Sequence, residues 1–265
     1  LNFAAITPHP PIIIPEIGKE NIDDAKDTVL AMEQLERKFN QADIDTIIII
    51  SPHAESRSFA MTIFAPPEFS ADFGNFEAPN VKLKFPSDKS LALNLASECQ
   101  AADILIEVEA GQISLDHGAM VPLYYLTKNT GRSIKLIEIA FSSLPPADHI
   151  EFGRVIGEVV NGEKDRIALI ASGDMSHRIF DEHYCQYGKK FDRDIVDLIK
   201  NHRLSEIINI DEDLVDLAGE CGYRPLLILA GALNEKHYQP EQPSLSAPEQ
   251  LLIMYKKQIL FIIVL

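Results

Sequence analysis

The histidines are the residues of this sequence best suited to chemistry, because a neutral imidazole binds transition metals and titrates near neutral pH. The chain of 265 residues contains eight of them. Three of these, His9, His53 and His177, follow the C-terminal ends of predicted buried strands within a few residues. An open α/β sheet binds its ligands at this edge. The sequence therefore predicts that the three histidines share one site.

Two imidazoles and one carboxylate form a ligand set that leaves coordination positions open, as in non-heme Fe(II) oxygenases. The candidate carboxylates are Glu55, Asp174 and Glu220. Glu220 lies between glycines, just before a predicted apolar helix whose N-terminus favours an anion. Alternatively, Glu220 is only an acidic residue at the start of the helix. Cys221, its neighbour, is a competing soft ligand.

His117 follows Asp116 and precedes a predicted helix. His117 is a candidate to support a metal ligand or to contact a substrate. Alternatively, it is only the residue that begins the helix. The remaining four histidines lie in helical or polar stretches, and we predict that they are solvated or structural: His149, His183, His202 and His237.

Short apolar runs alternate along the chain with amphipathic stretches, which is typical of an α/β protein. We predict strands at 3–6, 46–50, 103–108, 134–141 and 166–171. Helices are predicted at 19–40, 88–102, 117–129, from after 148 to about 160, 184–201, 203–208, 211–218 and 223–235. Residues 59–86 read as strands joined by irregular loops, residues 239–249 as a loop, and the last segment as a strand or a helix–strand pair. The predicted fold is one α/β domain over residues 1–265, with a central mixed sheet flanked by helices.

The charge balance excludes some partners. Lys plus Arg number 24 and Asp plus Glu number 40, which gives a net charge of −16. This field disfavours nucleic acid and anionic membrane surfaces. Three scattered cysteines fit a reducing cytoplasm, and no signal peptide is recognisable. The longest apolar run, 259–265, is too short to cross a bilayer, which needs about 20 residues.

Five short motifs occur at predicted strand or helix ends in a fixed order: Thr7-Pro-His-Pro-Pro, Ser51-Pro-His-Ala-Glu, Leu115-Asp-His-Gly, Gly173-Asp-Met-Ser-His and Gly219-Glu-Cys-Gly-Tyr-Arg. Together they resemble the class III extradiol ring-cleavage dioxygenases of the LigB type and the related Memo-like proteins. The resemblance runs from residue 3 to about 235.

This resemblance implies a role for each motif residue. His9, His53 and Glu220 match the metal ligands of a non-heme Fe(II) site, although another divalent metal such as Zn, Mn or Cu is an alternative. His177 matches the acid–base histidine, with Asp174 as its supporting residue. His117 matches a histidine that contacts substrate or oxygen. In Memo-like proteins a cysteine lies where Cys221 falls, so Cys221 is the alternative ligand.

The leading hypothesis is therefore an Fe(II)-dependent extradiol dioxygenase that cleaves a catechol-type ring with O2. One alternative is a Memo-like metal-binding protein with a redox or partner-binding role, and another is a metal-dependent hydrolase. The family resemblance also suggests a homo-oligomer. The orientation of Glu220 relative to Cys221 discriminates between the first two hypotheses.

Overall fold

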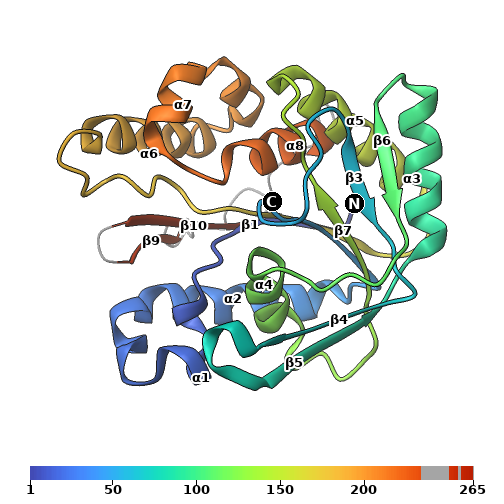
Figure 1. Cartoon of the computed structure of the whole chain (residues 1–265), viewed down its shortest axis with the longest axis horizontal. Coiled ribbons are helices and arrows are strands. Elements are labelled where there is room, and N and C mark those ends of the chain that lie inside the picture. The colour runs from blue at the N-terminus through green and yellow to red at the C-terminus, as the bar shows by residue number, and fades with distance from the viewer. Residues whose placement is uncertain (234–250, 256–257, 265) are drawn as a thin grey trace.

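A mixed eight-stranded sheet forms the centre of the protein (Figure 1). The computed structural model describes residues 1–233, 251–255 and 258–264. Across the sheet the strand order is β6-β3-β7-β2-β8-β1-β10-β9. The strands are β1 (Phe3–Thr7), β2 (Thr46–Ile50), β3 (Met61–Phe64), β6 (Ile106–Glu109), β7 (Lys135–Ala140), β8 (Ile167–Ser172), β9 (Leu251–Tyr255) and β10 (Gln258–Val264). The predicted fold class is confirmed.

The four central strands β7, β2, β8 and β1 run parallel to one another. β3 is antiparallel to β7, and β10 is antiparallel to β1. Every residue of β1, β2 and β8 is buried, as expected for apolar runs that are covered on both faces.

Helices cover both faces of the sheet (Figure 1). One face packs against α3 (Lys89–Ala101), α5 (Pro146–Gly162), α6 (Cys185–Lys200), α7 (Glu212–Ala218) and α8 (Tyr223–Leu233). The other packs against α2 (Lys26–Ala42), α4 (His117–Thr127) and the separate hairpin of β4 (Glu68–Phe73) and β5 (Ala78–Pro86). No helix in the described ranges is long and apolar enough to cross a membrane.

Several predicted elements need correction. The predicted helix 19–40 is divided into a 3-10 segment, Lys19–Ala25, and α2; the first part contains Asn and Asp, residue types that favour turns over helix interiors. The strand predicted at 103–108 begins only at Ile106, since Asp103 adopts a positive φ of 59° after α3. Residues 204–209 form a 3-10 helix, and the last segment forms two antiparallel strands. The predicted loop 239–249 lies outside the described residues.

The strand register brings three chain segments to one edge of the sheet. Thr7, the last residue of β1, pairs with Ser172, the last residue of β8. Ile50, the last residue of β2, pairs with Ala171. The loops that carry His9, His53 and His177 therefore leave the sheet side by side.

Candidate metal centre

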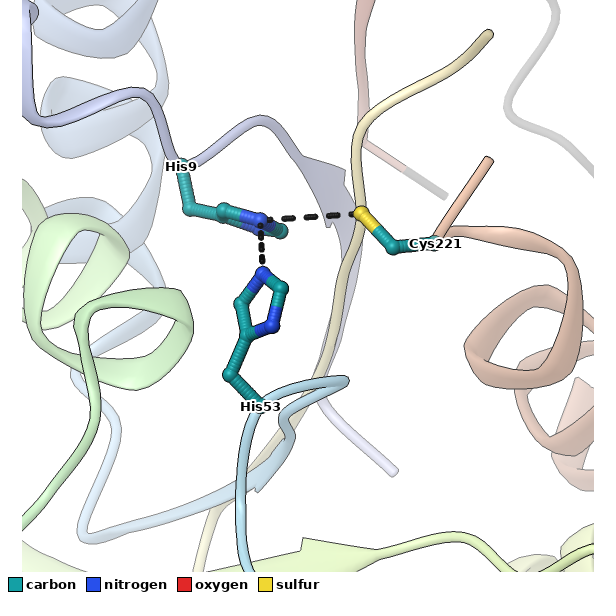
Figure 2. Close-up of side chains that lie close together, drawn as sticks. All are labelled: His9, His53 and Cys221. Carbon is teal, nitrogen blue, oxygen red and sulfur yellow. Dashed lines mark hydrogen bonds between the residues drawn. The ribbon is translucent and has the colours of Figure 1, made fainter. Parts of the chain in front are cut away.

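Three side chains from distant parts of the chain face one another at this edge (Figure 2). The Nε2 atoms of His9 and His53 are 3.1 Å apart. The Sγ atom of Cys221 lies 3.7 Å from His9 Nε2. His9 is buried, Cys221 is half-buried and His53 is exposed, so the cluster opens to solvent on the His53 side.

Two glycines allow Cys221 to reach the histidines. Cys221 lies in the connection between α7 and α8, which packs directly on the loop after β8. A β-carbon on Gly173 would lie 2.3 Å from the Cα atom of Gly222, so the two backbones can meet only without side chains. The contact is fixed by the Cys221 amide, which donates to Asp174 O (3.3 Å), and by the Asp174 amide, which donates to Cys221 Sγ (3.2 Å).

Ser172 sets the tautomer of His9. Its hydroxyl donates to Gly118 O at 2.6 Å, and His9 Nδ1 lies 2.9 Å from the same Oγ. Because the single hydroxyl proton is already used, Ser172 Oγ can only accept from His9, so Nδ1 carries the proton. The lone pair of His9 is therefore on Nε2, which faces His53 and Cys221.

The protonation states follow from burial. Desolvation, partly opposed by Asp174, lowers the pKa of His9. Desolvation and the neighbouring His9 lower the pKa of His53 to about 4. Both rings are thus neutral at pH 7 and able to bind a metal. Burial, and secondarily the charge of Asp174, raises the pKa of the Cys221 thiol, which a bound metal would deprotonate.

The spacing of these donors fits a metal ion. A four-coordinate ion with metal–nitrogen distances of about 2.05 Å and a metal–sulfur distance of about 2.3 Å separates its nitrogens by roughly 3.3 Å and nitrogen from sulfur by roughly 3.6 Å. The 3.1 Å and 3.7 Å separations found here are close to these values. Imidazole and thiolate ligands suit Zn, Cu and Fe.

Asp174 and His177 adjoin the same sulfur. His177 Nε2 lies 3.9 Å from Cys221 Sγ, and its side chain is exposed. Asp174 accepts from the His9 amide at 3.1 Å, and its Oδ2 lies 3.7 Å from His9 Nε2. Asp174, His177 and Cys221 form a second group of donors within 4.8 Å of one another. Asp174 thus supports His9 as well as adjoining His177.

His117, the first residue of α4, adjoins both histidines of the cluster. Its ring stacks on His53 with centroids 4.3 Å apart and lies 5.5 Å from the His9 ring. Phe76 contacts its edge with a centroid distance of 5.7 Å. His117 therefore lies beside the two histidines of the cluster, and its contact with a substrate or oxygen stays a prediction.

Glu220 is turned away from the histidines. Its Oε2 accepts from the Tyr223 amide at the start of α8, which is the helix-start role considered above. Burial raises its pKa to about 7. Glu55, another of the three carboxylate candidates, is 77% exposed and pairs with Arg57 at 2.6 Å. Of the ligand alternatives weighed from the sequence, Cys221 is grouped with both His9 and His53, whereas Asp174 lies near His9 and is grouped with His177 and Cys221.

The three other histidines that the structure describes lie away from the cluster of His9, His53 and Cys221. His149 is fully buried, with Nδ1 3.0 Å from Pro145 O and Nε2 3.2 Å from Ser142 O. His183 and His202 are exposed. His237 lies outside the described residues.

Sequence reasoning overlooked two serines. Ser172 supports His9, and Ser51 donates to the Asp116 carboxylate at 2.7 Å next to the His53 loop. Both serines lie at the ends of the strands that precede the candidate histidines, so their position in the sequence could have indicated a role at the site. Their hydrogen bonds span 54 and 65 residues, a pairing that only the folded chain shows.

Comparisons with known proteins identify the family of the chain. Residues 3–250 match the family described as the catalytic LigB subunit of aromatic ring-opening dioxygenase. Protein CA_C1420 of Clostridium acetobutylicum is 29% identical over 252 residues, covering 91% of this chain and 54% of the relative. The chain thus spans about half the length of that curated relative.

Two further proteins cover nearly the whole chain. The 3,4-dihydroxyphenylacetate 2,3-dioxygenase of Escherichia coli is 24% identical over 262 residues, covering 92% of this chain and 93% of the relative. A crystal structure of an uncharacterized Escherichia coli K12 protein matches with a TM-score of 0.58 and 18% identity, over 99% of each chain. The structural match shows a shared fold, and the sequence match over residues 3–250 places this chain in the LigB family of ring-opening dioxygenase catalytic subunits.

Proposed function

We propose that this protein binds a redox-active transition metal through His9, His53 and Cys221 and uses it in oxygen-dependent chemistry on a catechol-type compound. The single observation that carries the metal site is the convergence of these three donors from separate loops at the edge of the sheet. Membership of the LigB family and the likeness to a dihydroxyphenylacetate dioxygenase support the reaction class. A bound Fe(II) would supply a centre where catechol and O2 meet.

The surrounding residues have the chemistry that such a reaction needs. His177 is exposed and 3.9 Å from Cys221 Sγ, so it can accept a proton from a substrate hydroxyl at the centre and return it. His117 stacks on His53 and offers a second imidazole to the same substrate. Asp174 holds the His9 backbone and favours a positive charge on the site.

A second candidate function is favoured by the orientation of residues 220 and 221. A carboxylate ligand is typical of the oxygenase facial triad, whereas Cys221 supplies sulfur here. This geometry supports a Memo-like metal protein whose role is redox chemistry without ring cleavage. Thiolate ligands favour Cu(I) and Zn as well as iron.

Oxygen uptake distinguishes these functions. The purified protein would be loaded anaerobically with Fe(II), Cu(I) or Zn(II), and its metal content measured. Each form would then be tested in an oxygen electrode with a panel of catechols. Iron-dependent oxygen uptake with a ring-cleaved product supports the dioxygenase. Stoichiometric metal without oxygen uptake on any catechol refutes the dioxygenase and leaves the redox protein, and metal-dependent turnover without oxygen points to a hydrolase.

The ligand assignment has its own test. His9→Ala and His53→Ala should each lower metal affinity by at least tenfold, because each removes one of three protein ligands. His183→Ala is the matched control, since this histidine is exposed. Full stoichiometric metal in both ligand variants would refute the assignment.

A further inference from the structure

A carboxylic side chain lies beneath the site in an otherwise apolar layer. Glu138 is on β7 and is 1% exposed. Side chains alternate between the faces of a strand, so Glu138 shares its face with Leu136 and Ala140, which belong to the core under α2 and α4. An ionised carboxylate without partners is costly at such a position, so this residue needs a specific hydrogen-bond partner.

The partner is Asp116, the residue that caps α4. Ser51 brings the two carboxyl groups together, because its amide donates to Ile139 O at 3.0 Å, next to Glu138, and its hydroxyl donates to Asp116 at 2.7 Å. Asp116 acts on Glu138 through its charge and through hydrogen bonding. Asp116 Oδ2 and Glu138 Oε1 are both buried, and among the described residues no donor is found for either atom. Ionised carboxylates only accept, so they can bond to each other only if one carries a proton.

The surroundings decide which group holds this proton. Asp116 Oδ1 accepts from the amides of Gly118 (2.6 Å) and Ala119 (3.3 Å) and from Ser51 Oγ (2.7 Å). The N-terminus of α4 also favours a negative charge there. Burial, with the adjacent Asp116 charge, raises the pKa of Glu138 well above its usual range. Glu138 is therefore the group that holds the proton and donates it in a hydrogen bond to the Asp116 carboxyl group.

Asp116 in turn connects the two stacked histidines. As the cap of α4 it fixes the helix that begins with His117, and through Ser51 it holds the loop of His53, whose amide lies 3.5 Å from Ser51 Oγ. Gly118 lets the helix approach this loop, because a β-carbon there would lie 2.6 Å from Ser51 Oγ and 3.2 Å from His53 Cδ2. One carboxylate thus determines the relative position of His53 and His117.

We propose that Glu138 is a positioning residue that, as a neutral acid, donates a hydrogen bond to Asp116 and so holds His53 and His117 in register at the centre. It touches neither the histidines nor a substrate. Loss of the donor would leave the buried Asp116 Oδ2 without a partner, and the carboxylate would turn or draw in water. Both histidines would then lose their common support.

Two variants of Glu138 separate donation from packing. Glu138→Gln keeps a donor toward Asp116, whereas Glu138→Met keeps the approximate volume and removes the donor. Leu136→Ala is the control, because it disturbs the same face of β7 without touching Asp116. We expect Glu138→Met to lower metal affinity about tenfold, the usual effect of losing a support behind a ligand, and Glu138→Gln to restore it. This readout rests on the proposed function.

Two readouts do not need a metal. The infrared difference spectrum of the metal-free proteins at pH 7, wild type minus Glu138→Gln, should contain a carbonyl band of a neutral carboxyl group. The difference cancels the bands of Asp192 and Glu220, whose pKa values are also about 7. The NMR signals of the His53 and His117 rings should shift in Glu138→Met and stay near the wild-type positions in Glu138→Gln and Leu136→Ala. A difference spectrum without this band, or histidine signals unchanged in Glu138→Met, would overturn the proposal. If no form binds metal, the proposed function fails while these two measurements still decide the role of Glu138.

Discussion

At the scale of single residues, the site depends on side chains behind the donors as much as on the donors themselves. Ser172 illustrates this, because its hydroxyl proton goes to Gly118 O and its lone pair receives His9 Nδ1–H. The histidine is thereby held with Nε2 free toward His53 and Cys221.

Ser172→Ala should weaken metal binding by 10- to 100-fold, the typical effect of removing a partner of a ligating histidine. Metal titration measures the affinity, and NMR of the His9 ring reports the tautomer. Ser142→Ala is the matched control, because Ser142 is also buried but its hydroxyl contacts Met61 Sδ. Equal losses in both variants, or an unchanged His9 tautomer in Ser172→Ala, would contradict this role.

Substitutions of the neighbouring residues Glu220 and Cys221 should have different effects on metal binding. Cys221→Ser should abolish the sulfur-to-metal charge-transfer absorption of the Co(II)-loaded protein and reduce affinity at least tenfold. Glu220→Gln should retain both, because its amide oxygen can still accept from the Tyr223 amide. The reverse pattern would make the carboxylate the third ligand.

At the scale of elements, the site is an assembly of loops held by close backbone contacts. The strands were predictable because β-branched runs covered on both faces have few alternatives. The approach of the α7–α8 connection to the loop after β8 was not predictable from the sequence. It depends on two glycines that are 49 residues apart and that belong to no periodic sequence pattern.

Gly173→Ala should therefore displace Cys221. The new methyl group would overlap the Cα atom of Gly222, and we expect a loss of about 1–3 kcal/mol in the free energy of unfolding, with weaker metal binding. Urea unfolding and metal titration measure the two effects. Gly162→Ala is the control, since a β-carbon there meets nothing within 4 Å. Wild-type affinity in Gly173→Ala would show that this contact does not place Cys221.

At the scale of the whole molecule, an acidic chain buries several of its carboxyl groups. Asp192 on α6 is fully buried; its Oδ1 accepts from the Ser176 amide at 2.9 Å, next to His177. Its Oδ2 is buried without a partner among the described residues. Desolvation raises the pKa of Asp192 to about 7.

This shift gives the pH dependence of stability a definite sign. An unfolded Asp has a pKa of about 3.9, so below about pH 4 both states hold the proton and no penalty arises. Between about pH 4 and pH 7 only the unfolded state releases it, so stability falls as pH rises, by at most about 4 kcal/mol. As far as Asp192 is concerned, the folded state is therefore most stable at low pH.

Asp192→Asn should remove this slope. The free energy of unfolding of the variant, relative to wild type, should rise between pH 4 and pH 7 and then stay constant, as measured by urea unfolding at a series of pH values. Asp197→Asn, at an exposed position on the same helix, is the control. A difference that does not depend on pH would show that Asp192 titrates normally.

The sequence by itself determined the α/β class and the edge of the sheet where chemistry gathers. Strand runs, loop-forming prolines and the positions of His9, His53 and His177 are local properties, and a parallel sheet aligns its carboxyl ends. Only the tertiary structure decided between Glu220 and Cys221. Adjacent residues in a tight turn point in different directions, and the turn's orientation is set by the contact of Gly222 with Gly173 and by the start of α8. The support of the site by Ser172, Ser51 and Glu138 is likewise tertiary, because these partners are distant in sequence and meet only when the sheet and α4 are packed.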